Sequence, residues 1–269
     1  MRLGVTMFAT DLAMPVHELA RAAEERGFDS LYVPEHTHIP VSRRTPYPGG
    51  GELPEEYRRT LDPLVALSYA AAVTSTLRVG TGILLAAQRD PIVTAKALAS
   101  LDHLSGGRVV VGVGFGWNVE EIENHGVPYG RRREVARRNV LAMQALWRDE
   151  VADFEGAEPA WSWPKPLRMP PVYLGGAPGP KLFAQVAEYA DGWMPIGGHG
   201  IKAALPALRE ACEKAGRPQA GEVIPFGTRP TRDKLDYYAS LGIGQVVANL
   251  PSGPADVVLP LLDEYAALL

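Results

Sequence analysis

Strand-type and helix-type segments alternate along the whole chain, and this order constrains the fold more than any other feature. Eight short apolar runs are each followed by a longer run with helical spacing, and no two apolar runs form a long hairpin. The expected strands are 3–8, 30–33, 77–80, 108–113, 172–174, 192–195, 222–226 and 245–249. The expected helices are 15–26, 62–74, 91–104, 130–147, 179–189, 201–215, 231–241 and 256–268. The order predicts an α/β fold in which residues 1–269 form a single (β/α)8 domain, a closed parallel TIM barrel.

A doubly wound dinucleotide-binding sheet is the main alternative for alternating strands and helices. Its fingerprint, G-x-G-x-x-G after a strand, is missing from the first strand-to-helix turn at 8–15. Near Gly112 the spacing is Gly-x-Gly-x-Gly-Trp, so the third glycine of that fingerprint is not in place. The closed barrel is therefore the better interpretation.

Composition excludes several classes of protein. Hydrophobic residues make up 46% of the 269 positions, enough for a full core, and the net charge of −4 argues against nucleic-acid binding. The single cysteine, Cys212, rules out an internal disulfide and suits a reducing cytoplasm. No apolar run approaches the ~20 residues of a membrane span, and the chain opens directly into a strand. We expect a cytoplasmic protein with no membrane or nucleic-acid partner.

Glycine stands at the end of three successive predicted strands, at 80–82, 112–116 and 175–176. Glycine permits positive φ and allows a ligand to approach the main chain, which a Cβ would prevent. The carboxyl ends of barrel strands meet at one mouth, where barrel enzymes have their active sites. These glycines therefore predict one shared ligand site at that mouth.

Two connections are long for a compact domain, 37–61 and 149–171. The first follows a strand and so begins at the C-terminal mouth, where it is expected to act as a lid. The second precedes a strand and begins on the opposite face, although its length would let it reach around the barrel.

His36, just after the second strand, is the main acid–base candidate. An imidazole exchanges protons near neutral pH, and Glu35 beside it either orients the ring or faces a neighbouring strand. The alternative is a histidine that bonds a loop backbone. Glu35-His36-Thr37-His38 also resembles a metal site, but no Asp or Glu ends the third, fourth or fifth strand, and the other histidines considered fall in a helix or in loops, so no metal is expected.

The remaining candidates concern a bound cofactor. Gly175, Gly176 and Ala177 precede a helix and would hold a phosphate, or simply form a tight turn. Thr81, with Gly82 beside it, would contact a cofactor ring or merely end its strand. Gly114, Trp117 and Asn118 lie at the fourth strand end, where Trp117 would pack on a flat ring or in the core and Asn118 would bond the ring or cap a helix.

Residues expected to line a partly aromatic substrate pocket are Tyr47, Trp193 and His199. Two arginine clusters have opposite interpretations. The run 131–133 is interpreted as a solvated helix face, whereas Arg43 and Arg44 in the expected lid are better placed to meet an acidic ligand.

Seven segments together resemble the luciferase-like monooxygenase superfamily, most closely its actinobacterial branch of F420-dependent oxidoreductases. They are AAEERGFDSLYVPEH (22–36), RVGTGI (78–83), RDP (89–91), LDHLSGGR (101–108), GVGFGWNVEE (112–121), PVYLGG (171–176) and ADGW (190–193). The resemblance covers nearly the whole chain, and the order of the segments makes it specific.

The resemblance implies a (β/α)8 barrel that binds coenzyme F420, or alternatively FMN, at its C-terminal mouth. It implies a non-proline cis peptide at Thr81-Gly82 against the ring, a phosphate loop at Gly175-Gly176, and catalysis by Glu35 and His36. Where some deazaflavin dehydrogenases of the superfamily have a catalytic Glu after strand four, this chain has Trp117, which argues against sugar-phosphate dehydrogenation.

Three functions stay open from the sequence. The first is hydride transfer between F420 and a small organic substrate. The second is an FMN-dependent monooxygenase that uses dioxygen and a separate flavin reductase, and the third is a catalytically silent flavin-binding barrel. The resemblance also implies a homodimer.

Overall fold

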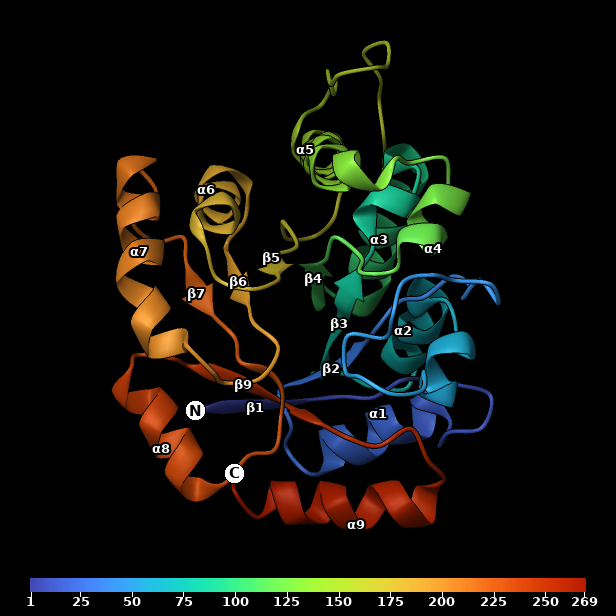
Figure 1. Ribbon diagram of the computed structural model, residues 1–269, viewed down its shortest axis with the longest axis vertical. Coiled ribbons are helices and arrows are strands. Elements are labelled where there is room, and N and C mark those ends of the chain that lie inside the picture. Colours follow the sequence, from blue (N-terminus) through green and yellow to red (C-terminus); the bar gives the residue numbers. More distant parts are fainter.

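The computed structural model describes residues 1–269, which form one curled sheet surrounded by helices (Figure 1). The strands are β1 (Arg2–Thr6), β2 (Ser30–Val33), β3 (Arg78–Leu84), β4 (Val109–Val113), β5 (Val172–Gly175), β6 (Gly192–Met194), β7 (Glu222–Val223), β8 (Phe226–Thr228) and β9 (Gln245–Asn249). All pairings between them are parallel, in the order β7-β6-β5-β4-β3-β2-β1-β9-β8. The predicted (β/α)8 architecture is confirmed.

The seventh barrel strand is broken, where the sequence predicts one strand over 222–226. Pro225 has no N–H to donate, and it separates β7 from β8. The two pieces still close the barrel, because Phe226 N–H donates to Pro195 O at 2.8 Å and Val247 N–H donates to Pro225 O at 2.9 Å. The broken strand thus joins β6 on one side to β9 on the other.

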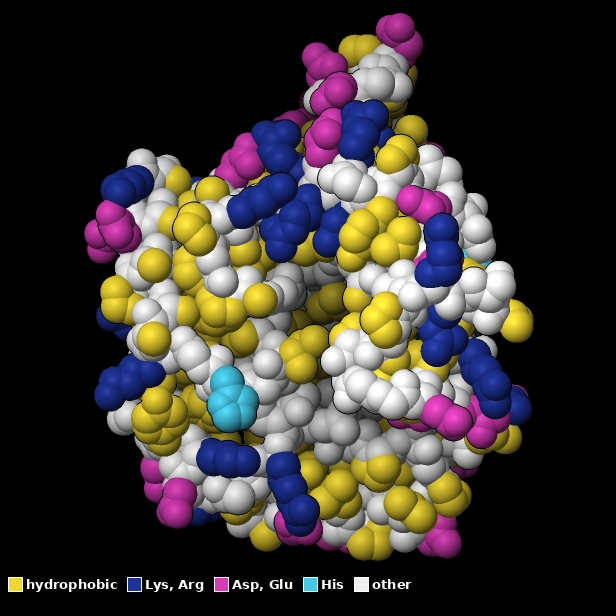
Figure 2. Space-filling view, in the orientation of Figure 1, with side chains coloured by type: hydrophobic (Ala, Val, Ile, Leu, Met, Phe, Trp, Pro, Cys, Tyr) yellow, Lys and Arg dark blue, Asp and Glu magenta, His cyan; other side chains and the backbone are white.

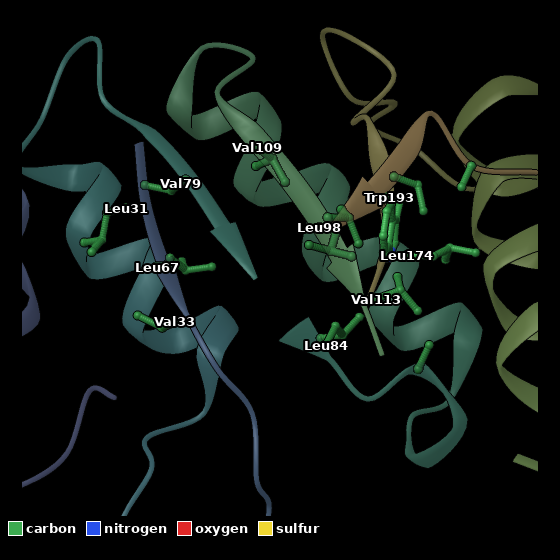
Figure 3. Packing of buried hydrophobic residues seen from close by; sticks show 14 of the residues in the cluster. Leu31, Val33, Leu67, Val79, Leu84, Leu98, Val109, Val113, Leu174 and Trp193 are labelled. Atoms are coloured by element: carbon green, nitrogen blue, oxygen red, sulfur yellow. The ribbon is translucent and has the colours of Figure 1, made fainter. Parts of the chain in front are cut away.

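Alternation along the strands divides the core into two layers. In β4, Val109, Val111 and Val113 face the helices, whereas Val110 faces the barrel interior, as the two-residue period of a strand requires. The interior is filled by Tyr32, Val110, Tyr173, Met194, Ile224, Phe226 and Val247. Figure 3 shows the outer layer, in which strand residues such as Val79 pack with Leu67 and Leu98 from the surrounding helices.

The helices are α1 (Val16–Glu25), α2 (Pro63–Ala72), α3 (Pro91–Ser105), α4 (Val119–Asn124), α5 (Arg132–Arg148), α6 (Pro180–Tyr189), α7 (Ile201–Lys214), α8 (Arg232–Ser240) and α9 (Ala255–Ala266). All eight predicted helices lie within two residues of these bounds at either end. The Asp62 and Asp90 side chains cap α2 and α3 by accepting backbone N–H bonds, with proline at the first helical position. No helix has the length and apolar character needed to cross a membrane.

Two further elements depart from the sequence expectation. Strand β3 continues to Leu84, four residues beyond the predicted end. The short helix α4 was not expected; it begins where the Asn118 side chain accepts the Glu121 N–H at 3.4 Å. Asn118 is therefore the helix cap, one of its two predicted roles.

The two long loops take different courses. Loop 37–61 returns across the mouth, where it contains a short 3₁₀ turn (Glu55–Arg58), and Thr60 pairs with Thr10 near its end. Loop 149–171 extends away from the barrel beyond α5 (Figure 1), and an antiparallel bridge joins Ala152 to Ala160 near its tip. Only loop 37–61 is positioned as the predicted lid.

Candidate active site

His36 lies at the mouth, three residues after β2, and is held by a carboxylate from α4. Its Nδ1 is 2.8 Å from Glu121 Oε2, and the two side chains are only 7% and 1% exposed. The other carboxylate oxygen accepts the Thr37 N–H at 3.2 Å. Because both oxygens of Glu121 act as acceptors, Nδ1 is the donor, and Nε2 is left with a free lone pair. No protein group bonds Nε2, so it is available to a substrate.

Three aromatic side chains surround this histidine. The Tyr57 and Trp117 rings have centroids 5.2 and 5.9 Å from the imidazole, and Tyr47 from the lid loop packs on both. Burial, together with the Tyr47 hydroxyl, raises the pKa of Tyr57, so its phenol stays protonated at neutral pH. Tyr47 and Trp117 therefore lie in one cluster with His36, which combines an apolar wall with hydroxyl donors.

Glu35 does not take the predicted catalytic position. It is 3% exposed and turned away from His36; its oxygens accept bonds from Leu85 N–H and Arg89 Nε, each at 2.6 Å. Arg89 also donates to Asp62 Oδ2 at 2.7 Å. Burial raises the pKa of Glu35, and the Arg89 charge counteracts that rise. This carboxylate fastens the end of β2 to the segment after β3, so the catalytic prediction for it is wrong.

Glu121 is the carboxylate that sequence reasoning missed. It stands three residues after the helix cap Asn118, a spacing typical of the first turn of a helix. This helix-start pattern directly follows a glycine-rich strand end, so it could have been used to predict a carboxylate at the mouth. The sequence does not show that this first turn packs against the end of β2.

Ile83, not Thr81, is the residue that β3 presents to the mouth. The cis peptide is Gly82-Ile83, one position later than expected, because β3 runs further than predicted. Thr81 is fully buried, and its hydroxyl donates to Gly112 O at 2.8 Å. Ile83 packs on the barrel interior and fills the space that Gly114 leaves open, since a Cβ on Gly114 would overlap its side chain.

The predicted phosphate loop is open to a ligand. Gly176 has φ +135°, and the N–H groups of Gly176 and Ala177 donate to no protein acceptor. Arg133, from the first turn of α5, approaches to 3.8 Å from where a Gly176 Cβ would stand, and its guanidinium lies 4.1 Å above the Phe115 ring. Burial and Arg132 lower the pKa of Arg133 from its ordinary high value. The prediction that Arg133 lies on a solvated helix face is therefore wrong.

Figure 2 shows a central hollow on this face with Lys and Arg side chains along one edge. Trp193 does not line it, contrary to expectation. Its side chain is fully buried, packs on Phe183, and donates from Nε1 to Gly176 O at 2.9 Å. Trp193 thus supports the glycine loop from beneath. His199 is exposed and lines a separate hollow between the ends of β6 and β8.

The parallel sheet defines a (β/α)8 barrel, and the glycine-lined mouth with its buried histidine–carboxylate pair is the candidate ligand site at the C-terminal end. The chain belongs to the luciferase-like monooxygenase family, whose sequence profile matches residues 11–231.

Similar proteins include one of unassigned function and two with named activities. Rv0953c, an uncharacterized protein of Mycobacterium tuberculosis, is 42% identical over alignments covering 100% of this chain and 99% of its own. The F420-dependent glucose-6-phosphate dehydrogenase of Nakamurella multipartita is 32% identical, over 74% of this chain and 58% of the enzyme. Among solved structures, monooxygenase RslO1 from Streptomyces bottropensis superposes with a TM-score of 0.80 at 19% identity, covering 100% and 98% of the two chains.

Proposed function

We propose that this protein is an F420-dependent oxidoreductase that transfers a hydride between the deazaflavin and a small organic substrate bound above its ring. The observation that carries the proposal is the pairing of His36 Nδ1 with Glu121 at 2.8 Å, which leaves Nε2 free at the mouth. Support for F420 as the cofactor comes from the partial 32% identity to an F420-dependent enzyme.

The residues present fit such a cofactor. Ile83 offers an apolar support at the mouth, and Gly114 and Gly175 leave room for its side chain. The free N–H groups of Gly176 and Ala177, with the Arg133 guanidinium, would hold a phosphate. When bound, the deazaflavin accepts or donates a hydride at its C5 atom.

The protein's own contribution is to move a proton and to exclude water. When a substrate alcohol is oxidised, the hydroxyl proton passes to His36 Nε2 as the hydride leaves the adjacent carbon. Glu121 holds the ring in the required tautomer and stabilises the imidazolium that forms. Tyr57 and Trp117 enclose the histidine, and loop 37–61 covers it.

An FMN-dependent monooxygenase with a separate reductase is the second candidate. The family name and the 0.80 TM-score to monooxygenase RslO1 favour it. The same phosphate loop and ring support would serve FMN, and dioxygen would then be consumed. A silent flavin-binding barrel would bind a cofactor but turn over no substrate.

Parallel fluorescence titrations of the purified protein with F420 and with FMN test the cofactor. Micromolar or tighter F420 binding with much weaker FMN binding is the expected result. The opposite preference, with oxygen consumption on reduced FMN, would establish the monooxygenase instead. Binding of neither cofactor would overturn both candidates.

A further inference from the structure

A second hollow of about 430 Å³ opens at the barrel mouth, between the ends of β6 and β8. Its wall includes Gly198, His199, Thr228, Arg229, Lys234 and Tyr238. In Figure 2 a histidine side chain, with Lys and Arg side chains near it, lies below and to the left of the central hollow. No step proposed above uses this second hollow.

Several hydrogen-bond donors in this wall have no acceptor. Thr228 is only 7% exposed, and its Oγ1 is buried without any partner. The N–H groups of Gly198 and His199 donate to no protein atom, and the Tyr238 hydroxyl makes no hydrogen bond. A buried polar group in a folded protein is nearly always paired, so the unpartnered Thr228 Oγ1 indicates a ligand that accepts hydrogen bonds, and the accessible N–H groups of Gly198 and His199 can donate to the same ligand.

The charge at the hollow also indicates a ligand that accepts hydrogen bonds. Lys234 Nζ donates to Arg229 O at 3.0 Å and forms no ion pair with a carboxylate. Arg229 is neutralised by Glu264 at 3.1 Å, so it adds little net charge. One uncompensated ammonium beside unpaired N–H and O–H donors is suited to a carboxylate or phosphate group.

We infer that this hollow binds the carboxylate or phosphate group of the substrate, with Thr228 Oγ1, the two free N–H groups and Lys234 as its donors. Barrel enzymes often bind phosphate in the loops after their last strands, and Thr228 ends the seventh strand here. That the ligand is a substrate group rests on the proposed function. The same chemistry would also suit an acidic group on the cofactor.

The two parts of the mouth are suitably separated. In the sheet, β8 and β2 are three positions apart, through β9 and β1, which is about 14 Å along the sheet. A substrate anchored at Thr228 would therefore extend over the barrel interior, where Phe226 packs edge-on against Tyr32, toward His36. The site selects small molecules with an acidic end.

Titration of the cofactor-free protein with inorganic phosphate, followed through backbone amide NMR signals, tests the site. Saturable shifts at Gly198 and His199 are expected. Lys234→Ala should weaken this binding at least tenfold and Thr228→Val about fivefold, whereas Lys214→Ala, which removes a distant lysine charge, should leave it unchanged. The melting temperature of each variant shows whether it is folded.

Absence of saturable shifts at these amides, or unaltered phosphate binding in Lys234→Ala, would overturn the inference. Shifts confined to Gly176 and Ala177 would also overturn it. F420 titration of the same variants separates the two sources of the anion. An unchanged Kd for F420 assigns the site to the substrate, and a parallel loss assigns it to the cofactor. The phosphate measurement contains no F420, so it fails or succeeds independently of the proposed function.

Discussion

At the residue scale, the proton chemistry of this site depends on Glu121 as much as on His36. The carboxylate accepts bonds from both His36 Nδ1 and Thr37 N–H, and it is almost completely buried. Removing a buried acceptor that fixes an imidazole and balances its charge typically lowers activity by one to two orders of magnitude. The pair is the part of the site on which mutation should act most directly.

Glu121→Gln should lower kcat by about 10- to 100-fold. The amide can accept from His36 only if its NH₂ group faces the Thr37 N–H, and it carries no charge to stabilise an imidazolium. Steady-state kinetics with F420 measure the loss, and the F420 Kd should stay within a few-fold. Glu123→Gln, two residues on and exposed, is the matched control. Unchanged kcat in Glu121→Gln would remove this residue from the mechanism.

His36→Ala should lower kcat/KM by about 10²- to 10⁴-fold, the usual contribution of a positioned acid–base group. Cofactor binding should persist, because Gly176, Ala177 and Arg133 are contributed by other strands and helices. The measurement is kcat/KM across pH 5–9 for wild type and variant. If the variant keeps full turnover with the same pH dependence, His36 carries no proton.

The sequence predicts where these residues lie along the barrel better than it predicts where their side chains point. His36 and Gly175-Gly176 are found because strand ends converge at one mouth. Glu35 and Trp193 also lie near strand ends. However, the Glu35 side chain forms an ion pair with Arg89 and the Trp193 side chain packs in the core, which the local sequence pattern does not reveal. Glu121 and Arg133 come from separate helices, so their partners depend on tertiary packing.

At the scale of elements, Glu120 of α4 holds the middle of the lid loop. Glu120 accepts the Arg44 N–H and the Thr45 hydroxyl, each at 2.6 Å. The bond from Thr45, followed by that from Arg44, lowers the pKa of Glu120 to about 2. This carboxylate therefore remains ionised throughout the physiological range, and the tie persists there.

Glu120→Ala should loosen loop 37–61 without unfolding the barrel. Hydrogen exchange at Arg44 is expected to become at least tenfold faster, since its N–H loses its acceptor. Amide exchange by mass spectrometry at pH 7 measures this, with Glu123→Ala as the control. Equal exchange in both variants would show that other contacts hold the lid.

Glu24 similarly joins α1 to the start of β3. Burial opposes its ionisation, but the N–H groups of Thr76, Leu77 and Ser75 outweigh that effect and lower the pKa of Glu24 to about 2. A pKa below its unfolded value of about 4.5 stabilises the fold above that pH, and this stabilisation is lost as pH falls toward 2. The side chain is largely solvated, so we expect about 1 kcal/mol.

Glu24→Gln should therefore reduce the free energy of unfolding at pH 7 by about 1 kcal/mol and have a progressively smaller effect between pH 4.5 and 2. Urea denaturation at several pH values measures both. Glu25→Gln, its exposed neighbour, should change little. An effect of Glu24→Gln that is constant down to pH 2 would contradict the role of its charge.

Element boundaries are predictable where local chemistry specifies them. Asp-Pro pairs place the starts of α2 and α3 correctly, because cap and first-turn preferences are properties of neighbouring residues. The break at Pro225 and the extension of β3 to Leu84 depend on which strand lies alongside, so the sequence pattern misplaces them.

At the scale of the whole molecule, α2 has an unusual surface for a barrel helix. It carries no charged residue over Pro63–Ala72, and although Leu64 and Leu67 pack inward, Val65 and Tyr69 are 70% and 55% exposed. Leu61 and Val16 extend this apolar surface into a groove of about 550 Å³. A helix that is apolar on all sides is normally covered on all sides.

A second copy of the chain is the occupant we expect, in agreement with the homodimer that the sequence resemblance implies. A twofold axis would place the same uncharged surface on both partners, so each groove would receive the other's Val65 and Tyr69 with no unpaired charge. This arrangement needs no partner of complementary charge, and the surface offers only Asp62, which is already bonded to Arg89.

Val65→Asp should raise the dimer dissociation constant at least 100-fold, because it would bury an unpaired carboxylate at the centre of the contact. Sedimentation velocity at micromolar concentration measures this; wild type should sediment as a dimer and the variant as a folded monomer. Val257→Asp, at an exposed valine on α9, is the matched control and should remain dimeric. A monomeric wild type, or a dimer that Val65→Asp leaves intact, would show that this surface is not the interface. Because the Val65 side chain is exposed on the outer side of α2 and touches none of the residues assigned to the cofactor, the monomer should still bind F420, which separates the assembly from the chemistry.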